Sequence, residues 1–246
     1  MKIALCLSGQ SRSVKAGYEF HKKNILDGND VTVFFHTWAS EDNPYAEALE
    51  LYEPQNWTVE KSLDVDLSKY TNTPPPSPNW KVKDGRMSTY AQLYAIERCN
   101  SMKCIYEQEF EMTFDWVIRS RFDFAINVRI PFDELDNSKL YIPNCRMVPT
   151  RDFGNDQFAF SSSKNMDNYA ECFNHIDEFY DAGVQYITGK KGGTEDEWKF
   201  GITLRNVGPG IKYSGDGFGI VLNTPTFGPS YSQAFESRSA LFELPV

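Results

Sequence analysis

The stretch Lys2-Ile-Ala-Leu-Cys-Leu7 is a short apolar run that stops at Ser8 and Gly9. A run of this kind is typical of a buried strand that leads into a loop. Apolar residues from Val14 to Leu26 are spaced as in a helix, and Val31 to Trp38 is a second run rich in β-branched and aromatic residues. Strand, helix and strand within the first 38 residues predict an α/β protein with a parallel sheet.

The rest of the chain adds further elements to this unit. The clearest helical pattern runs from Arg86 to Glu107, where most apolar residues recur at three- and four-residue intervals. Shorter patterns predict strands at 57–59, 114–118, 139–142 and 157–161, helices at 165–182 and 196–207, a surface loop at 61–85 and edge strands within 212–222. We expect residues 1–246 to form a single α/β domain, whose mixed, mainly parallel sheet is flanked by helices.

The charge of the chain limits the partners that it can bind. Acidic residues outnumber basic ones by 34 to 25, for a formal net charge of −9. This balance argues against a protein that coats nucleic acid or an anionic membrane. The acidic excess lies in 39–70 and 156–197, whereas 1–38 and 117–155 are slightly basic. A local pocket for a small phosphate ligand is therefore compatible with the composition.

The start of the chain and the cysteines indicate a compartment. The apolar run after Met1 is too short for a signal peptide or a membrane span. The five cysteines are an odd number and form no C-x-x-C pair, so free thiols in a reducing environment are the expected state. We therefore expect a cytoplasmic protein without a membrane span.

A first candidate binding loop is Ser8-Gly9-Gln10-Ser11-Arg12, at the carboxyl end of the first strand. Open α/β sheets bind ligands at this edge, and a small loop with free N–H groups suits a nucleotide. The sequence has neither the G-x-G-x-x-G fingerprint nor a P-loop, which argues against NAD-type and Walker-type sites. An ordinary turn between strand and helix is the alternative interpretation.

A second candidate is His36-Thr37-Trp38, at the end of the second strand. In a parallel sheet this segment lies beside the first loop. Trp38 can stack on a base, and His36 can donate a hydrogen bond to phosphate or sugar. The alternative is a histidine with a purely structural role.

The most informative cluster is Arg119-Ser120-Arg121-Phe122-Asp123, which follows an apolar run. Along a strand, alternation places Arg119, Arg121 and Asp123 on one side, so two guanidinium groups and one carboxylate face the same space. Two arginines can hold a diphosphate, and a carboxylate beside them can hold a divalent metal ion. The alternative is a structural ion pair at the edge of the sheet.

Taken together, five blocks resemble a family of GT-A-type glycosyltransferases found in bacterial surface-polysaccharide loci and in large DNA viruses and phages. The blocks are Ile3-Ala-Leu-Cys-Leu-Ser-Gly-Gln-Ser-Arg12, Val33-Phe-Phe-His-Thr-Trp38, Met87-Ser-Thr-Tyr90, Asp115-Trp-Val-Ile-Arg-Ser-Arg-Phe-Asp123 and Asp156-Gln-Phe-Ala-Phe160. The similarity runs in order over residues 1 to about 207. It implies a GT-A-like, Rossmann-like fold with a nucleotide-binding half at 1–125 and an acceptor-side half and tail at 126–246.

The resemblance also implies an activity and its partners. A hexosyl or pentosyl group would move from a nucleotide-diphospho-sugar donor, such as a UDP- or GDP-sugar, to a hydroxyl of a glycan acceptor. For a viral protein the compartment would be the host cytoplasm. The residues implied to bind the donor are Ser8, Gly9, Gln10, Arg12, His36, Thr37, Trp38, Arg119 and Arg121.

A divalent metal ion, Mn²⁺ or Mg²⁺, is a further implication of the resemblance. Asp123 matches the last position of the D-x-D metal motif of GT-A enzymes, whereas Arg121 stands at its first acidic position. Asp123 would then bind the metal ion, and Arg121 would supply part of the positive charge that the leaving diphosphate requires.

Three acidic residues are candidates for a catalytic base. Asp156 opens a β-rich run, and Glu195 and Asp196 stand at the start of an expected helix. An inverting transferase needs a carboxylate within hydrogen-bond reach of the acceptor hydroxyl. A turn or cap role for Asp156, and favourable charge at a helix N-terminus for the other two, are the alternatives.

Two other functions remain open at this point. One is a non-catalytic module that binds a nucleotide or a carbohydrate on the same scaffold. The other is a nucleotidyltransferase that acts on sugar phosphates, which the lack of a glycine-rich activation loop after the first strand disfavours.

Overall fold

The computed structural model describes residues 1–39, 45–70, 85–126, 129–143 and 157–177, together with three short strands at 212–214, 220–221 and 241–244. Four helices lie within these residues: α1 (Val14–His21), α2 (Tyr45–Tyr52), α3 (Gly85–Glu109) and α4 (Ser163–Ala170). A π-helical turn at Lys22–Leu26 extends α1, and 3₁₀ turns lie at Phe132–Glu134 and Glu171–His175.

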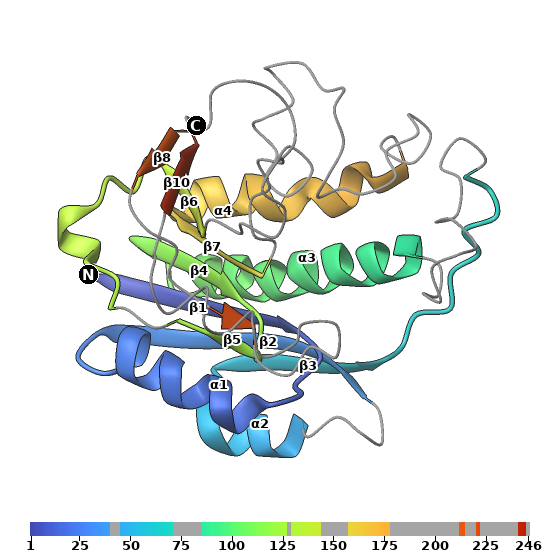
Figure 1. The fold of residues 1–246 in the computed structure, drawn as a ribbon, viewed down its shortest axis with the longest axis horizontal. Helices are drawn as coiled ribbons and strands as arrows, with labels where there is room; N and C mark the ends of the chain where they lie inside the picture. The colour runs from blue at the N-terminus through green and yellow to red at the C-terminus, as the bar shows by residue number, and fades with distance from the viewer. Residues whose placement is uncertain are drawn as a thin grey trace.

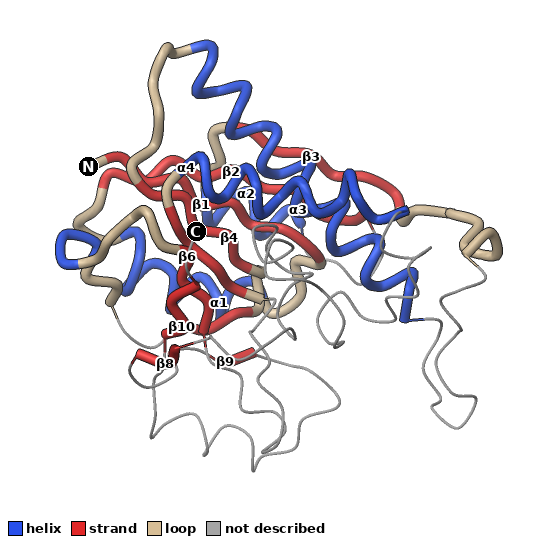
Figure 2. Tube along the Cα trace, turned by 90° about the horizontal axis from the view of Figure 1, so that it is seen from above, coloured by secondary structure: helices blue, strands red, loops and turns tan. Residues whose placement is uncertain are grey.

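The strands of the main sheet are β1 (Lys2–Gly9), β2 (Asp30–Ala39), β3 (Asn56–Lys61), β4 (Trp116–Ser120), β6 (Leu140–Pro143), β7 (Phe158–Ser161), β8 (Lys212–Ser214) and β10 (Leu241–Leu244). Their order is β3-β2-β1-β4-β7-β6-β10-β8. Figures 1 and 2 show β3 at one end of the sheet and β8 and β10 at the other. A separate two-stranded pair joins β5 (Phe124–Ala125) to β9 (Ile220–Val221).

The sheet has a parallel part and an antiparallel part. The neighbours β3, β2, β1 and β4 are all parallel, whereas β7 pairs antiparallel with β4 and the strands beyond it also pair antiparallel. The prediction of a mixed α/β fold with helices around the sheet is confirmed. The parallel character belongs to the first four strands.

Two apolar layers hold the helices on the sheet. Alternate residues of β1 divide between them: Ile3, Leu5 and Leu7 pack in the layer beneath α1 and α2, and Ala4 and Cys6 pack in the layer beneath α3 and α4. All five side chains are at most 4% exposed. In Figure 1 the two helix pairs accordingly cover opposite faces of the sheet. Burial on both faces explains why this strand is an uninterrupted apolar run in the sequence.

Most of the predicted elements are present, with shifts at their ends. The helix expected at 86–107 is α3, and the strands expected at 139–142 and 157–161 are β6 and β7. The helix expected at 165–182 begins earlier, at Ser163, and its part beyond 177 lies outside the described residues, as does the whole of 196–207. The sequence reasoning missed α2 in the acidic stretch after β2, and it missed β10 in the tail.

Within the described parts of the chain, no helix combines the length and the apolar character that a membrane span requires.

Candidate functional site

The carboxyl ends of β1, β2 and β4 border a pocket of about 510 Å³. Parallel strands place their carboxyl ends at one edge of a sheet, where α/β proteins bind ligands. The segment after β3 and the first turns of α3 complete the wall. The residues that line the pocket are Ser8, Gly9, Gln10, Arg12, Trp38, Ser62, Leu63, Met87, Ala91, Gln92, Arg119 and Arg121.

The loop after β1 forms one side of this pocket. Gly9 has φ +113°, a backbone conformation that favours glycine, and no atom lies within 4 Å of the place where a Cβ would stand. Ser13 at φ 51° then turns the chain into α1. The space over Gly9 is therefore open, and the backbone around it is accessible to a ligand.

Alternation along the strands decides which of the predicted donor residues reach the pocket. Every second side chain points to the same face of a sheet, and Ser8 and Trp38 lie on the face that α3 covers. Thr37 is fully buried and, by the same alternation, points to the face beneath α1 and α2. Thr37 therefore does not line the pocket, contrary to the expectation that it lies beside the donor.

His36 lies behind the pocket and does not line it. Its ring is fully buried, its Nε2 is 2.9 Å from Oε2 of Glu60, and its centroid is 4.7 Å from that of Trp38. Burial lowers the pKa of His36, and the hydrogen bond to Glu60 opposes this shift only in part. Trp38 also stacks on Tyr94, with ring centroids 5.8 Å apart. A neutral His36 thus holds the indole in place and is not positioned to contact a phosphate.

Three arginines contribute cationic groups to the wall of the pocket. Arg119 comes from β4 and is 2% exposed, whereas the side chains of Arg12 and Arg121 are 35% and 22% exposed. All three line the same pocket. The pocket therefore combines a cationic group with an indole, which suits a ligand that has an anionic part and a planar part.

The arginines come together through a turn that sequence reasoning did not predict. The strand ends at Ser120, and the Phe124 N–H donates to the Arg121 carbonyl at 3.3 Å. The prediction that Arg119, Arg121 and Asp123 alternate along one strand is therefore wrong. The turn nevertheless folds Asp123 back onto Arg121, so the two side chains do meet.

Asp123 is bound by two guanidinium groups. Its Oδ1 accepts from Arg121 Nε at 2.7 Å, and its Oδ2 accepts from Arg121 Nη2 at 2.6 Å and from Arg12 Nε at 2.9 Å. The carboxylate is 0% exposed. Arg12 is 111 positions away in the sequence. One buried carboxylate thus joins the loop after β1 to the turn after β4.

These contacts do not fit the expected role of Asp123 as a metal ligand. Both of its oxygens already accept charge-assisted hydrogen bonds, and a divalent ion bound to either oxygen would lie close to a guanidinium group. Like charges at this range repel strongly in a buried site. Asp123 is also absent from the residues that line the pocket.

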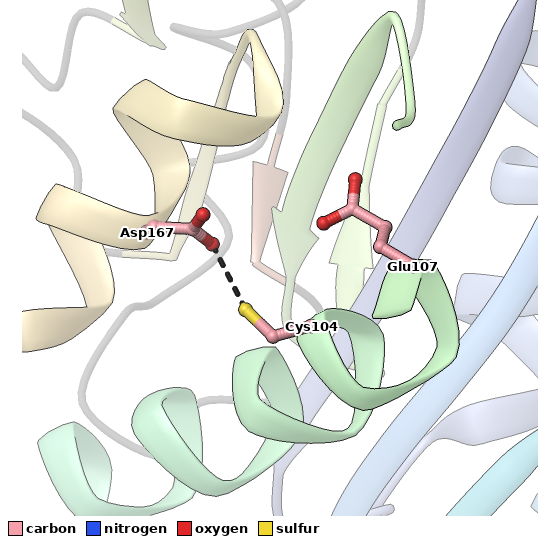
Figure 3. A group of neighbouring side chains, drawn as sticks. All are labelled: Cys104, Glu107 and Asp167. Carbon is pink, nitrogen blue, oxygen red and sulfur yellow. Dashed lines mark hydrogen bonds between the residues drawn. The ribbon is translucent and has the colours of Figure 1, made fainter. Parts of the chain in front are cut away.

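A separate cluster of two acidic residues and a cysteine lies between α3 and α4. Figure 3 shows Cys104, Glu107 and Asp167, whose possible ligand atoms all lie within 4.8 Å of one another. This spacing is compatible with a bound metal ion. The Cys104 thiol donates to Asp167 Oδ1 at 3.2 Å, and its pKa is raised to about 12, chiefly by burial. A metal ion bound here would have to displace the thiol proton, because the thiolate is the form that binds metal ions.

A lysine ammonium already pairs with both carboxylates of this cluster. Lys103 is 0% exposed, and its Nζ donates to Asp167 Oδ1 at 2.7 Å, to Glu107 Oε2 at 2.8 Å and to Ser163 Oγ at 2.6 Å. Burial lowers the pKa of Lys103, but these carboxylates raise it more, so the net shift is upward. The group is therefore best described as an ion-pair network that joins α3 to α4.

The lining set also includes residues that sequence reasoning did not name. These are Ser62, Leu63, Met87, Ala91 and Gln92. The block at Met87, at the start of α3, could have indicated that this helix lines the site. No motif in the sequence pointed to Ser62 and Leu63 after β3. The predicted bases Asp156, Glu195 and Asp196 lie outside the described residues.

The fold and site define a mixed α/β protein with an arginine-lined pocket at the carboxyl edge of its parallel strands. No protein-family model and no curated protein sequence matches the chain.

Proposed function

We propose that this protein is a GT-A-type glycosyltransferase, which moves a sugar from a UDP- or GDP-sugar to a hydroxyl of a glycan acceptor. The observation that carries the proposal is the pocket that joins Gly9, three arginines and Trp38 at the carboxyl edge of the parallel strands. Its volume of about 510 Å³ falls within the usual range for small-molecule sites.

The lining residues suggest how a donor would lie. Arg12, Arg119 and Arg121 can hold the diphosphate, since guanidinium groups match phosphate oxygens in two-point contacts. Trp38 offers a surface on which the base can stack, and Leu63 adds apolar contact. The open space over Gly9 allows the backbone to approach the ligand closely.

The proposed transfer reaction places negative charge on the leaving nucleoside diphosphate. The bond between the anomeric carbon and the β-phosphate oxygen breaks, and a bond to the acceptor oxygen forms. The acceptor loses a proton to a base, and the leaving nucleoside diphosphate gains negative charge. The arginines stabilise this developing charge. Asp156, Glu195 and Asp196 remain the predicted candidates for the base.

The test is binding and turnover with a panel of UDP- and GDP-sugars. Donors that bind should raise the melting temperature, and a true donor should release its nucleotide when a glycan acceptor is present. Arg121→Gln should lower donor affinity by about tenfold or more. Arg129→Gln, at an exposed arginine outside the lining set, is the matched control. Failure of every donor to bind would contradict the proposal.

A non-catalytic nucleotide-binding module is the second candidate. It is favoured by one observation: within the described parts of the chain, none of the residues that line the pocket is a carboxylate. Turnover separates the two functions, because a module binds the nucleotide and releases no product with any acceptor.

A further inference from the structure

Asp123 and its two arginines form a small ionic unit beside the pocket. The carboxylate is buried, whereas the two guanidinium groups that it holds also line the pocket. Arg12 reaches Asp123 through Nε alone, and Arg121 reaches it through Nε and Nη2. A guanidinium carries five N–H donors, so these three bonds use only part of the capacity of the pair.

The net charge of this unit decides which ligand it attracts. Two guanidinium groups and one carboxylate sum to one positive charge, and the buried Arg119 adds a second at the same pocket. The diphosphate of a nucleotide sugar carries two negative charges. The side chains alone can therefore balance a diphosphate, and a divalent ion at Asp123 would add charge where cations already stand.

We infer that Asp123 is a positioning residue that clamps Arg12 and Arg121 side by side, and that the pocket binds a nucleoside diphosphate without a divalent metal ion at Asp123. The inference rests on the proposed function of the pocket. It assigns to three arginines the electrostatic role that a metal ion has in other phosphate sites.

Electrostatics explains why a carboxylate would hold Arg12 and Arg121 side by side. Two neighbouring guanidinium groups repel each other, and a carboxylate between them removes much of that repulsion. Hydrogen bonds to both oxygens of Asp123 also fix the planes of the two groups, so less side-chain entropy is lost when a diphosphate binds.

The first experiment measures the affinity of the full chain for UDP and GDP by calorimetry, once in EDTA and once in manganese. Equal affinity in the two buffers is the expected result. Binding only in manganese would overturn the inference and leave the proposed function standing. Binding in neither buffer would contradict the proposed function itself, so the two failures are distinguishable.

The second experiment tests the clamp with Arg121→Lys, which keeps the charge but cannot make the two-point contact with Asp123. We expect UDP affinity in EDTA to fall by about tenfold, with uridine affinity unchanged, because uridine lacks the phosphates. A general structural defect would lower both affinities. Asp123→Asn is the companion variant, with the same expectation. Equal UDP affinity in wild type and both variants, with each protein shown to be folded by thermal unfolding, would overturn the positioning role.

Discussion

The backbone carbonyl of Phe122 lies directly against Gly17 of α1, so close that a Cβ on Gly17 would stand 1.8 Å from the carbonyl oxygen. No side chain can make room there, because the obstacle is backbone. Through this contact, α1 packs directly against the turn that carries Arg121 and Asp123. The absence of a side chain at one helix position thus helps to set the place of the arginines.

Gly17→Ala should therefore destabilise the protein by about 1–3 kcal/mol, because the methyl group forces the helix away from the turn. In an unobstructed helix the same change stabilises by about 1 kcal/mol, so the sign of the effect is diagnostic. Urea unfolding measures it, with Lys15→Ala at an exposed position of α1 as the control. An unchanged or higher unfolding midpoint for Gly17→Ala would show that α1 does not pack as described.

Trp38→Leu should weaken nucleotide binding by about tenfold, since base stacking on an aromatic ring is worth about 1–3 kcal/mol. Trp38 is 8% exposed and stacks on Tyr94, so the indole is held ready for a ligand. Trp57→Leu, at a tryptophan that is 46% exposed on the edge strand β3, is the control. Calorimetry with UDP and GDP measures both variants. Equal losses in the two would argue against a role for Trp38 in the pocket.

His21 predicts a pH dependence of stability. It is fully buried between Tyr52 and Ser120, at 2.7 and 3.1 Å, and burial lowers its pKa to about 3. Between pH 6.5 and 3 the unfolded chain binds a proton at this residue and the folded chain does not. Stability from His21 is thus fully present above about pH 6.5 and falls as the pH drops, by up to about 1.4 kcal/mol per pH unit.

His21→Gln removes this titration, and urea unfolding at a series of pH values tests it. The difference in unfolding free energy between wild type and variant should be largest above pH 6.5 and should shrink toward acid. A difference that stays constant over this range would mean that His21 is not buried in its neutral form.

Lys103→Met should destabilise the protein by about 3 kcal/mol or more, because it leaves Glu107 and Asp167 close together without their cation. Lys164→Met, at an exposed lysine of α4, should change stability by less than about 0.5 kcal/mol. Chemical unfolding compares the two variants. If Lys103→Met were as stable as wild type, the description of this cluster as an ion-pair network would be wrong.

Much of the site could be predicted from the sequence, for a reason that lies in sheet geometry. Strands that run parallel bring their carboxyl ends to one edge, so the residues after each apolar run were expected to meet. Seven of the nine residues predicted to bind a donor do line one pocket: Ser8, Gly9, Gln10, Arg12, Trp38, Arg119 and Arg121. Whether they bind a donor is part of the proposal.

The residues that could not be predicted depend on where a strand stops and which face a side chain takes. Thr37 is one position away from residues on the pocket face, and alternation sends it to the other side of the sheet. The contacts of Asp123 depend on where β4 ends. The strand stops at Ser120, one residue before Arg121, whose guanidinium group binds Asp123. A local pattern does not locate such an end to within one residue.

The sequence by itself determined the periods of β1, α1, β2 and α3, and with them the α/β character of the parallel half of the sheet, although not the presence of α2. Only the tertiary structure decided which charges meet. Arg12 and Asp123 are 111 positions apart, and Lys103 and Asp167 are 64 apart. Hydrophobic periodicity arises from neighbours along the chain, whereas an ion pair needs two side chains at one point in space. That coincidence follows from the way α1, α3 and α4 pack on the sheet, which no local pattern encodes.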